Sequence, residues 1–257
     1  MRLLLLISCA LWGCLSDASC AGDAVKIGII APLSGLHAND GFEFIEGSKT
    51  GINGVGGGIG FEGKPVEFVI LDTQCDPSSA AQGAGRLVEN ENVSIALELS
   101  CGRSTLVTSR VFQEMSVPHL VFNQSGIEEL DTLAGVGSAI SEDVVPLENF
   151  IQSMQNNQKL ATEMALGGHT LVEILIETIK EAGSIDADEL NKVLRSRTFL
   201  TSAGGVKFEP LGDGDSTSSS TFSLELWAKK RDCPKCPKSG ACPQALEVML
   251  SAKKTCN

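Results

Sequence analysis

Short apolar runs alternate with amphipathic stretches through the first half of the chain. Four runs rich in β-branched and aliphatic residues predict buried strands: residues 25–31, 66–71, 93–99 and 118–122. The segments between them carry apolar residues at helical spacing or helix-start signals. Strands that are apolar on both faces and alternate with helices indicate an α/β fold, with a parallel sheet flanked by helices on both sides.

Three helices are expected between these strands. The first is weakly signalled at residues 41–52, and the third covers residues 104–114. The second begins at Asp76 and Pro77, because an acidic N-cap followed by proline is a preferred way to start a helix. The first half of the chain therefore predicts the order β-α-β-α-β-α-β.

The pattern fades after the fourth strand and then returns. Residues 135–158 are mixed and polar, with no clear period. Residues 168–182 have strong helical spacing that stops at Gly183. Asp186 and Glu189 make a start like a capping box for a further short helix.

The last part of the chain predicts a hairpin and a cysteine-rich tail. Residues 205–208 and 221–228 are the expected strands of the hairpin, and the tail occupies residues 229–257. The tail contains Cys233, Cys236, Cys242 and Cys256. Two structural disulfides are favoured here over a zinc site or a redox Cys-x-x-Cys pair, because no thioredoxin-like βαβ unit surrounds the pair. No metal and no other cofactor is expected.

The beginning of the chain predicts an export signal of residues 1–21. Arg2 precedes an apolar stretch at residues 3–12, which is too short to span a bilayer comfortably. A lipid anchor at Cys14 is the alternative, ranked second because Trp12 is a poor residue for that motif. The expected location is therefore the periplasm or the extracellular space.

Composition excludes some functions. The chain of 257 residues has a formal net charge of -12, which argues against nucleic acid or an anionic membrane surface as a partner. Aromatic residues make up 5% and tyrosine is absent, so a pocket lined by aromatic rings is not expected. His37, His119 and His169 are scattered, and no Ser/His/Asp grouping or carboxylate pair has a recognisable spacing. An enzyme is therefore not predicted.

Residues 72–77 read Asp-Thr-Gln-Cys-Asp-Pro, and residues 25–35 form an apolar run followed by Pro-Leu-Ser-Gly. These stretches resemble the type I periplasmic binding proteins of ABC importers, in the group that binds branched-chain amino acids (Leu/Ile/Val). Residues 25–35 are similar to the opening strand and loop of that family, and residues 72–77 are the most specific match. Residues 99–101 are similar to the loop that pairs with it, and residues 182–213 to the family's closing region. The resemblance covers residues 25 to about 133 and about 166 to 228.

The resemblance implies a disulfide and a reduced domain organisation. It pairs Cys75 with Cys101, and both cysteines follow strands that are expected to be neighbours in the sheet. The family has two lobes, but only residues 135–158 stand where the second lobe is inserted, fewer than the ~50 residues that a small core needs. Residues 22–134 and 159–228 are therefore expected to form one lobe, with most of the second lobe missing.

A ligand is expected at the carboxyl ends of the parallel strands, where open α/β sheets bind their ligands. Free amides at helix N-termini suit a carboxylate, and an arginine there can pair with it bidentately. The predicted ligand-binding residues are Asp40, Gly102, Arg103, Ser104, Gln124, Ser125 and Gly126. An equally weighted reading makes Asp40 and Arg103 ordinary exposed loop charges.

These observations predict a solute-binding protein for an amino-acid-like ligand, delivered to the membrane subunits of an ABC importer, in a truncated form. The alternative is a protein-interaction or sensory module that uses the single lobe without transport and associates with a partner or a second copy through its uncovered cleft face. A redox or zinc protein working through the tail, and a gene remnant with an internal deletion, stay open as further interpretations.

Overall fold

The computed structural model describes residues 24–54, 65–124, 127, 134–139, 145–209 and 220–226. The predicted signal peptide, the cysteine-rich tail, Ser125 and Gly126 lie outside the described residues. Along the described residues the elements are β1 (Val25–Ala31), α1 (Ala38–Gly54), β2 (Val66–Asp72), α2 (Pro77–Glu89), β3 (Ile95–Leu99), α3 (Arg103–Glu114), β4 (His119–Phe122), β5 (Gly135–Ala139), α4 (Val145–Asn156), α5 (Glu163–Ala182), α6 (Ala187–Ser196), β6 (Thr198–Thr201), β7 (Gly204–Glu209) and β8 (Thr221–Leu226).

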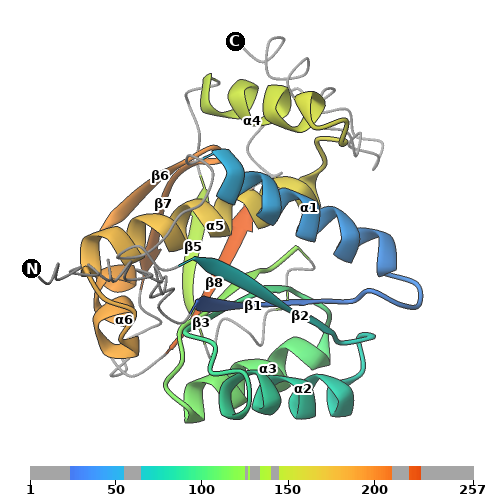
Figure 1. Ribbon diagram of the computed structural model, residues 1–257, viewed down its shortest axis with the longest axis vertical. Helices are drawn as coiled ribbons and strands as arrows, with labels where there is room; N and C mark the ends of the chain where they lie inside the picture. Colours follow the sequence, from blue (N-terminus) through green and yellow to red (C-terminus); the bar gives the residue numbers. More distant parts are fainter. Residues whose placement is uncertain are drawn as a thin grey trace, which may run out of the picture.

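The strands form one sheet in the order β2-β1-β3-β4-β8-β5-β7-β6 (Figure 1). Every pairing from β2 to β5 is parallel, whereas β7 runs antiparallel to β5 and β6 antiparallel to β7. The predicted α/β class, with a largely parallel sheet, is confirmed.

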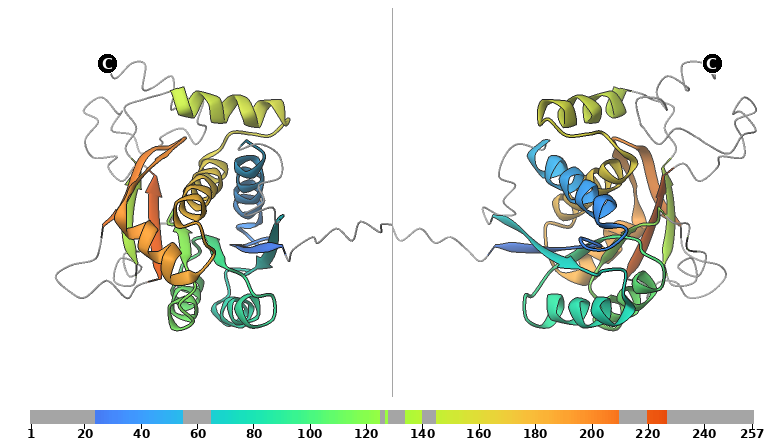
Figure 2. Two further views of the ribbon diagram at one scale, coloured as in Figure 1. Left: turned by 60° about the vertical axis from the view of Figure 1, so that its left-hand side comes forward. Right: turned by 90° about the vertical axis from the view of Figure 1, so that its right-hand side faces the viewer.

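Helices cover both faces of the sheet. α1 and α5 lie on one face and α2 and α3 on the other, as the views in Figures 1 and 2 agree. The strands supply apolar residues to both sides because successive side chains point to opposite faces. Ile29 packs in the cluster under α1 and α5, and its neighbour Ile30 packs with Leu87 of α2 and Phe112 of α3.

The helix signals in the sequence act as predicted. Asp76 caps α2, where its carboxylate accepts a hydrogen bond of 2.8 Å from the amide of Ser79. Asp186 caps α6 in the same way. Gly183 ends α5 in the left-handed conformation, with φ of 58°. α5 itself begins at Glu163, five residues before the predicted start, because Thr162 caps it.

The segment without a sequence period nevertheless contains regular structure. β5 lies within it and inserts between β8 and β7. α4 follows and buries Leu147, Phe150 and Met154 in the main core. The five residues of β5 (Gly-Val-Gly-Ser-Ala) are too small and too few for a period to emerge, so their pairing partners define the strand.

The predicted hairpin has different strands from those expected. β7 pairs with β6, with Thr201 opposite Gly204 at the turn, and not with β8. β5 lies between β7 and β8, so these two strands share a sheet without pairing to each other. The prediction failed because Thr198–Thr201 is only four residues long and its polarity does not follow its burial: Leu200 is exposed, whereas Thr201 is buried.

Candidate ligand-binding site

The parallel strands β1 to β4 end at one edge of the sheet, called here the carboxyl edge. Four loops leave from this edge, at residues 32–37, 73–76, 100–102 and 123–124. Ligands of open parallel sheets bind at such an edge. The described part of these loops therefore defines the candidate site.

Asp72, the last residue of β2, joins the first two loops. Its Oδ1 atom accepts hydrogen bonds from the amides of Leu33 (2.8 Å) and Gln74 (2.9 Å). Partial burial acts to raise the pKa of Asp72, but these amides, together with the hydroxyl and amide of Ser34, hold it below its ordinary value. An ionised Asp72 thus fixes the loop after β1 to the loop after β2.

A disulfide joins the second loop to the third. Cys75 and Cys101 form this bond, with their Cα atoms 5.4 Å apart. β1 lies between β2 and β3, so the two cysteines do not follow neighbouring strands as the sequence suggested. Strands two places apart are separated by roughly 9.6 Å, so the loops converge over the end of β1. Gln74 and Cys75 permit this by adopting positive φ angles of 53° and 55°.

The third loop leads into α3, whose N-cap residue and first helical residue are exposed. Gly102 occupies the N-cap position with φ of 55°, and no side chain caps the helix there. Gly102 and Arg103 are both exposed. Ser104 is buried and its hydroxyl donates to the carbonyl oxygen of Cys101 at 2.7 Å, so its hydrogen is used within the loop. Thr105 supports the same loop by accepting from the amide of Cys101 at 2.8 Å.

The other predicted residues occupy two further loops. Asp40 lies in the first turn of α1, and its Oδ2 atom is 3.3 Å from Nδ1 of His37, with both side chains about half exposed. Gln124 follows β4 and is exposed, next to the buried Asn123, whose side-chain oxygen accepts from the amide of Ile127 at 2.9 Å. The structure thus brings Asp40, the first turn of α3 and Gln124 to one edge.

Sequence reasoning missed two residues of this region. Asp72 was noticed only as part of a motif, although an acid directly after a buried strand is a signal for loop contacts. Glu98 was overlooked inside β3, where it is a charged residue in an otherwise apolar run (Ile-Ala-Leu-Glu-Leu) and is fully buried. A buried carboxylate needs partners, so such an interruption is informative.

The described part of the carboxyl edge carries charges of both signs. The guanidinium of Arg103 at the start of α3 can pair with a carboxylate, while Asp40 offers a negative charge on another loop. The amides of Ser104 and Thr105 donate to the carbonyl oxygens of Cys101 and Gly102. Among the residues that the structure describes, no group of three or more His, Cys, Asp or Glu side chains could hold a metal ion. Within the same residues, no helix combines the length and apolar character that crossing a membrane requires.

Part of this chain is similar in sequence to known binding proteins. Residues 24–138 match the family model described as periplasmic binding protein. An amino acid binding protein of Pseudomonas aeruginosa is 27% identical over 93 residues, which is 36% of this chain and 25% of that protein. The matched stretches span about a quarter of the length of the curated relatives.

Solved structures show the same fold. A leucine binding protein from Thermotoga maritima superimposes with a TM-score of 0.60 at 14% identity, over 74% of this chain and 93% of that one. A solute binding protein from Rhodopseudomonas palustris, solved in complex with 4-hydroxybenzoate, gives a TM-score of 0.59 at 13% identity, over 77% and 90% of the two chains. At these identities the likeness concerns the fold alone.

Proposed function

We propose that the protein is a solute-binding protein for an amino-acid-like ligand, delivered to the membrane subunits of an ABC importer, because residues 24–138 match the family model described as periplasmic binding protein. The observation that carries the proposal is the first turn of α3. Its amides are uncapped by any side chain, Arg103 is exposed beside them, and the Cys75–Cys101 disulfide holds the turn at the carboxyl edge. A preformed site of this kind binds without first having to become ordered.

Each end of the ligand has a partner in this proposal. The carboxylate lies against the amide of Gly102 and the guanidinium of Arg103, where the helix dipole favours negative charge. The ammonium group lies toward Asp40, and Gln124 supplies an amide on the far side of the edge. Ser104 stabilises the loop, because its hydroxyl donates a hydrogen bond to the carbonyl oxygen of Cys101.

The proposed form of the protein is a single lobe. Residues 140–144 join β5 to α4, which packs back on the same core, so the described residues contain one body around one sheet. A binding protein without a second jaw leaves its ligand exposed on one side. We expect weaker affinity and faster release than in a protein that closes around its ligand. The family also favours the periplasm or the extracellular space as its location.

A thermal-shift screen of the mature chain against L-amino acids, their amides and benzoates tests the proposal. A ligand at 100 times its Kd adds about 2.7 kcal/mol to the free energy of unfolding. At this chain length, each kcal/mol raises the Tm by roughly 2–4 °C. The matched variants are Arg103→Ala and Arg110→Ala, since both arginines are exposed on α3 but only Arg103 lies in its first turn. The shift should disappear in Arg103→Ala and persist in Arg110→Ala.

One observation favours the interaction module as a second candidate. Leu36 is 93% exposed and Phe42 is 55% exposed, and both lie at the carboxyl edge, in or next to the loop before α1. Exposed apolar side chains beside a binding edge are typical of a docking surface. A protein that unfolds cooperatively, binds no member of the panel and sediments as a dimer that Leu36→Ser dissociates would favour this second function over transport.

A further inference from the structure

The buried face of helix α3 carries mostly hydroxyl groups. Its buried residues are Ser104, Thr105, Thr108, Ser109 and Phe112, whereas the neighbouring α2 buries Ala80, Gly83, Ala84 and Leu87. The hydroxyls of Ser104 and Ser109 donate to backbone carbonyl oxygens of the loop and of α3 itself, but the hydroxyl of Thr108 donates to Glu98 in the sheet. Hydrophobic contact is non-directional, whereas a hydrogen bond fixes a distance and an angle. The bond between Thr108 and Glu98 therefore helps to set where along the sheet this helix lies.

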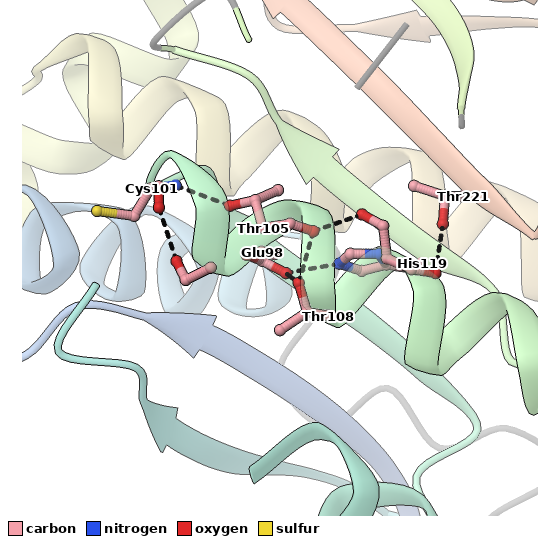
Figure 3. A network of polar contacts seen from close by, with 8 residues as sticks. Glu98, Cys101, Thr105, Thr108, His119 and Thr221 are labelled. Carbon is pink, nitrogen blue, oxygen red and sulfur yellow. Dashed lines mark hydrogen bonds and ion pairs between the residues drawn. The ribbon is translucent and has the colours of Figure 1, made fainter. Parts of the chain in front are cut away.

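Glu98 is the charged group at the centre of these contacts (Figure 3). It lies in β3 beneath α3, and its Oε2 atom is 2.6 Å from the hydroxyl of Thr108 and 2.9 Å from Nε2 of His119. The hydroxyl of Thr108 donates to this oxygen, and the imidazole of His119 contacts the same oxygen through Nε2. Glu98 thus connects β3 with both α3 and β4.

This arrangement is unfavourable for stability alone. Side chains of His119 and Glu98 are 0% and 1% exposed. Within the part of the chain that the structure describes, the Oε1 atom of Glu98 and the Nδ1 atom of His119 have no hydrogen-bond partner. Buried polar atoms without partners are destabilising, and apolar residues of similar size often replace a buried polar pair without loss of stability. A role other than stability is needed to explain why a carboxylate lies here.

A continuous series of contacts runs from Glu98 to the first turn of α3. The hydroxyl of Thr108 also lies 2.9 Å from the carbonyl oxygen of Thr105, one turn closer to the helix start. The hydroxyl of Thr105 accepts from the amide of Cys101. Cys101 is in turn bonded to Cys75. Moving α3 along the sheet would break the bond to Glu98 and displace this first turn.

We propose that Glu98 is a positioning residue, which through Thr108 fixes α3 and the first turn that carries Gly102 and Arg103 at the carboxyl edge. The identity of the ligand at this turn rests on the proposed function, but the positioning role of Glu98 does not. Glu98 of β3 and Thr108 of α3 are bonded directly, so the effect of this bond on the first turn can be measured without a ligand.

Amide hydrogen exchange by NMR tests the inference directly. Glu98→Leu and Thr108→Val remove the bond to α3, and Glu98→Gln keeps an acceptor oxygen in place. Thr178→Val is the matched control, because Thr178 is also a buried helical threonine, but among the described residues its hydroxyl donates to the carbonyl oxygen of Ile174 in its own helix and to no other element. Exchange at the Ser104 and Thr105 amides should accelerate by about tenfold or more in Glu98→Leu and Thr108→Val, and stay near wild type in Glu98→Gln and Thr178→Val.

Two results would overturn the inference. Unchanged exchange in the first turn of Thr108→Val would show that the bond positions nothing, and equal acceleration throughout the protein would show a merely structural role. If Glu98→Leu does not fold, Thr108→Val carries the test. The panel of L-amino acids, their amides and benzoates separates the two proposals: if wild type binds none of them but the first turn still responds to Thr108→Val, the positioning role stands and the proposed function fails.

Discussion

Gly47 of α1 and Ala165 of α5 are in direct backbone contact, because a Cβ atom on Gly47 would collide with the carbonyl oxygen of Ala165. Gly168 of α5 has the same relation to the carbonyl oxygen of Phe44 in α1. The two helices therefore approach each other more closely than any pair with side chains at these positions could. The contact packs α1 against α5, the two helices that cover one face of the sheet.

Because of this contact, we expect Gly47→Ala and a glycine substitution in another helix to change stability in opposite directions. Gly47→Ala should destabilise the fold by about 1–3 kcal/mol, since the backbone of α5 cannot give way as a flexible side chain could. Gly85→Ala is the control, because Gly85 lies inside α2 with no atom within 4 Å of its added Cβ. That change should stabilise by about 0.5–1 kcal/mol through helix propensity. Urea unfolding of both variants measures the difference, and equal effects would contradict the packing.

The Cys75–Cys101 disulfide predicts a loss of stability when both residues are replaced. The bond closes a loop with a sequence separation of 26 residues. On the chain-entropy model, Cys75→Ser combined with Cys101→Ser should lower the free energy of unfolding by about 3 kcal/mol. Unfolding of wild type and double variant should be compared with and without reductant. If reductant lowers the stability of the double variant as much as that of wild type, the tail cysteines and not this pair are responsible.

Asp72 predicts an acid-sensitive step in stability. Its pKa is lowered in the folded protein, so the stability that it contributes is complete above its unfolded value of about 3.9 and is lost as the pH falls through the lower folded value. Asp72→Asn should cost about 1–2 kcal/mol at neutral pH and flatten the stability curve below about pH 4. Thermal unfolding between pH 2 and pH 7 checks this, with the exposed Asp188→Asn as control. An unchanged acid limb would show that the amides of Leu33 and Gln74 do not hold the charge.

The carboxylate of Glu173 on α5 is expected to stabilise the turn between β6 and β7. It accepts from the amide and from the hydroxyl of Ser202, each at 2.8 Å. Glu173→Leu should cost about 1–3 kcal/mol, because the amide of Ser202 loses its partner. Glu181, which is 62% exposed and pairs with Arg197, provides the control. Glu181→Leu should change stability by less than about 0.5 kcal/mol. Comparable losses in both variants would contradict a special role for the turn contact.

The first half of the fold was predictable because its signals are local. Strand runs such as residues 25–31, and the helix start at Asp76 and Pro77, depend on side chains adjacent in sequence, and the structure confirms them. β5 was not predictable, because its glycines and small residues become a strand only through the two strands that flank it. The pairing of β7 with β6 was missed because the sequence of Thr198–Thr201 does not show the alternation of its burial.

The location of the candidate site could be predicted from the sequence, but the hydrogen bonds within it could not. Parallel topology alone put Asp40, Arg103 and Gln124 at one edge of the sheet, and the structure agrees with that placement. The engagement of the Ser104 hydroxyl with Cys101 depends on the turn geometry at Gly102, which no spacing encodes. That these residues bind a ligand stays a prediction.

The place of β8 in the sheet has a consequence for the order of folding. β8 is the last described strand along the chain, yet it lies between β4 and β5 and pairs with both. Without it, β2, β1, β3 and β4 form one group and β5, β7 and β6 another, each with an unpaired inner border. Pairings between such distant parts of a chain form slowly. In synthesis from the amino end, we therefore expect these two groups of strands to pair with each other only after residues 221–226 have emerged.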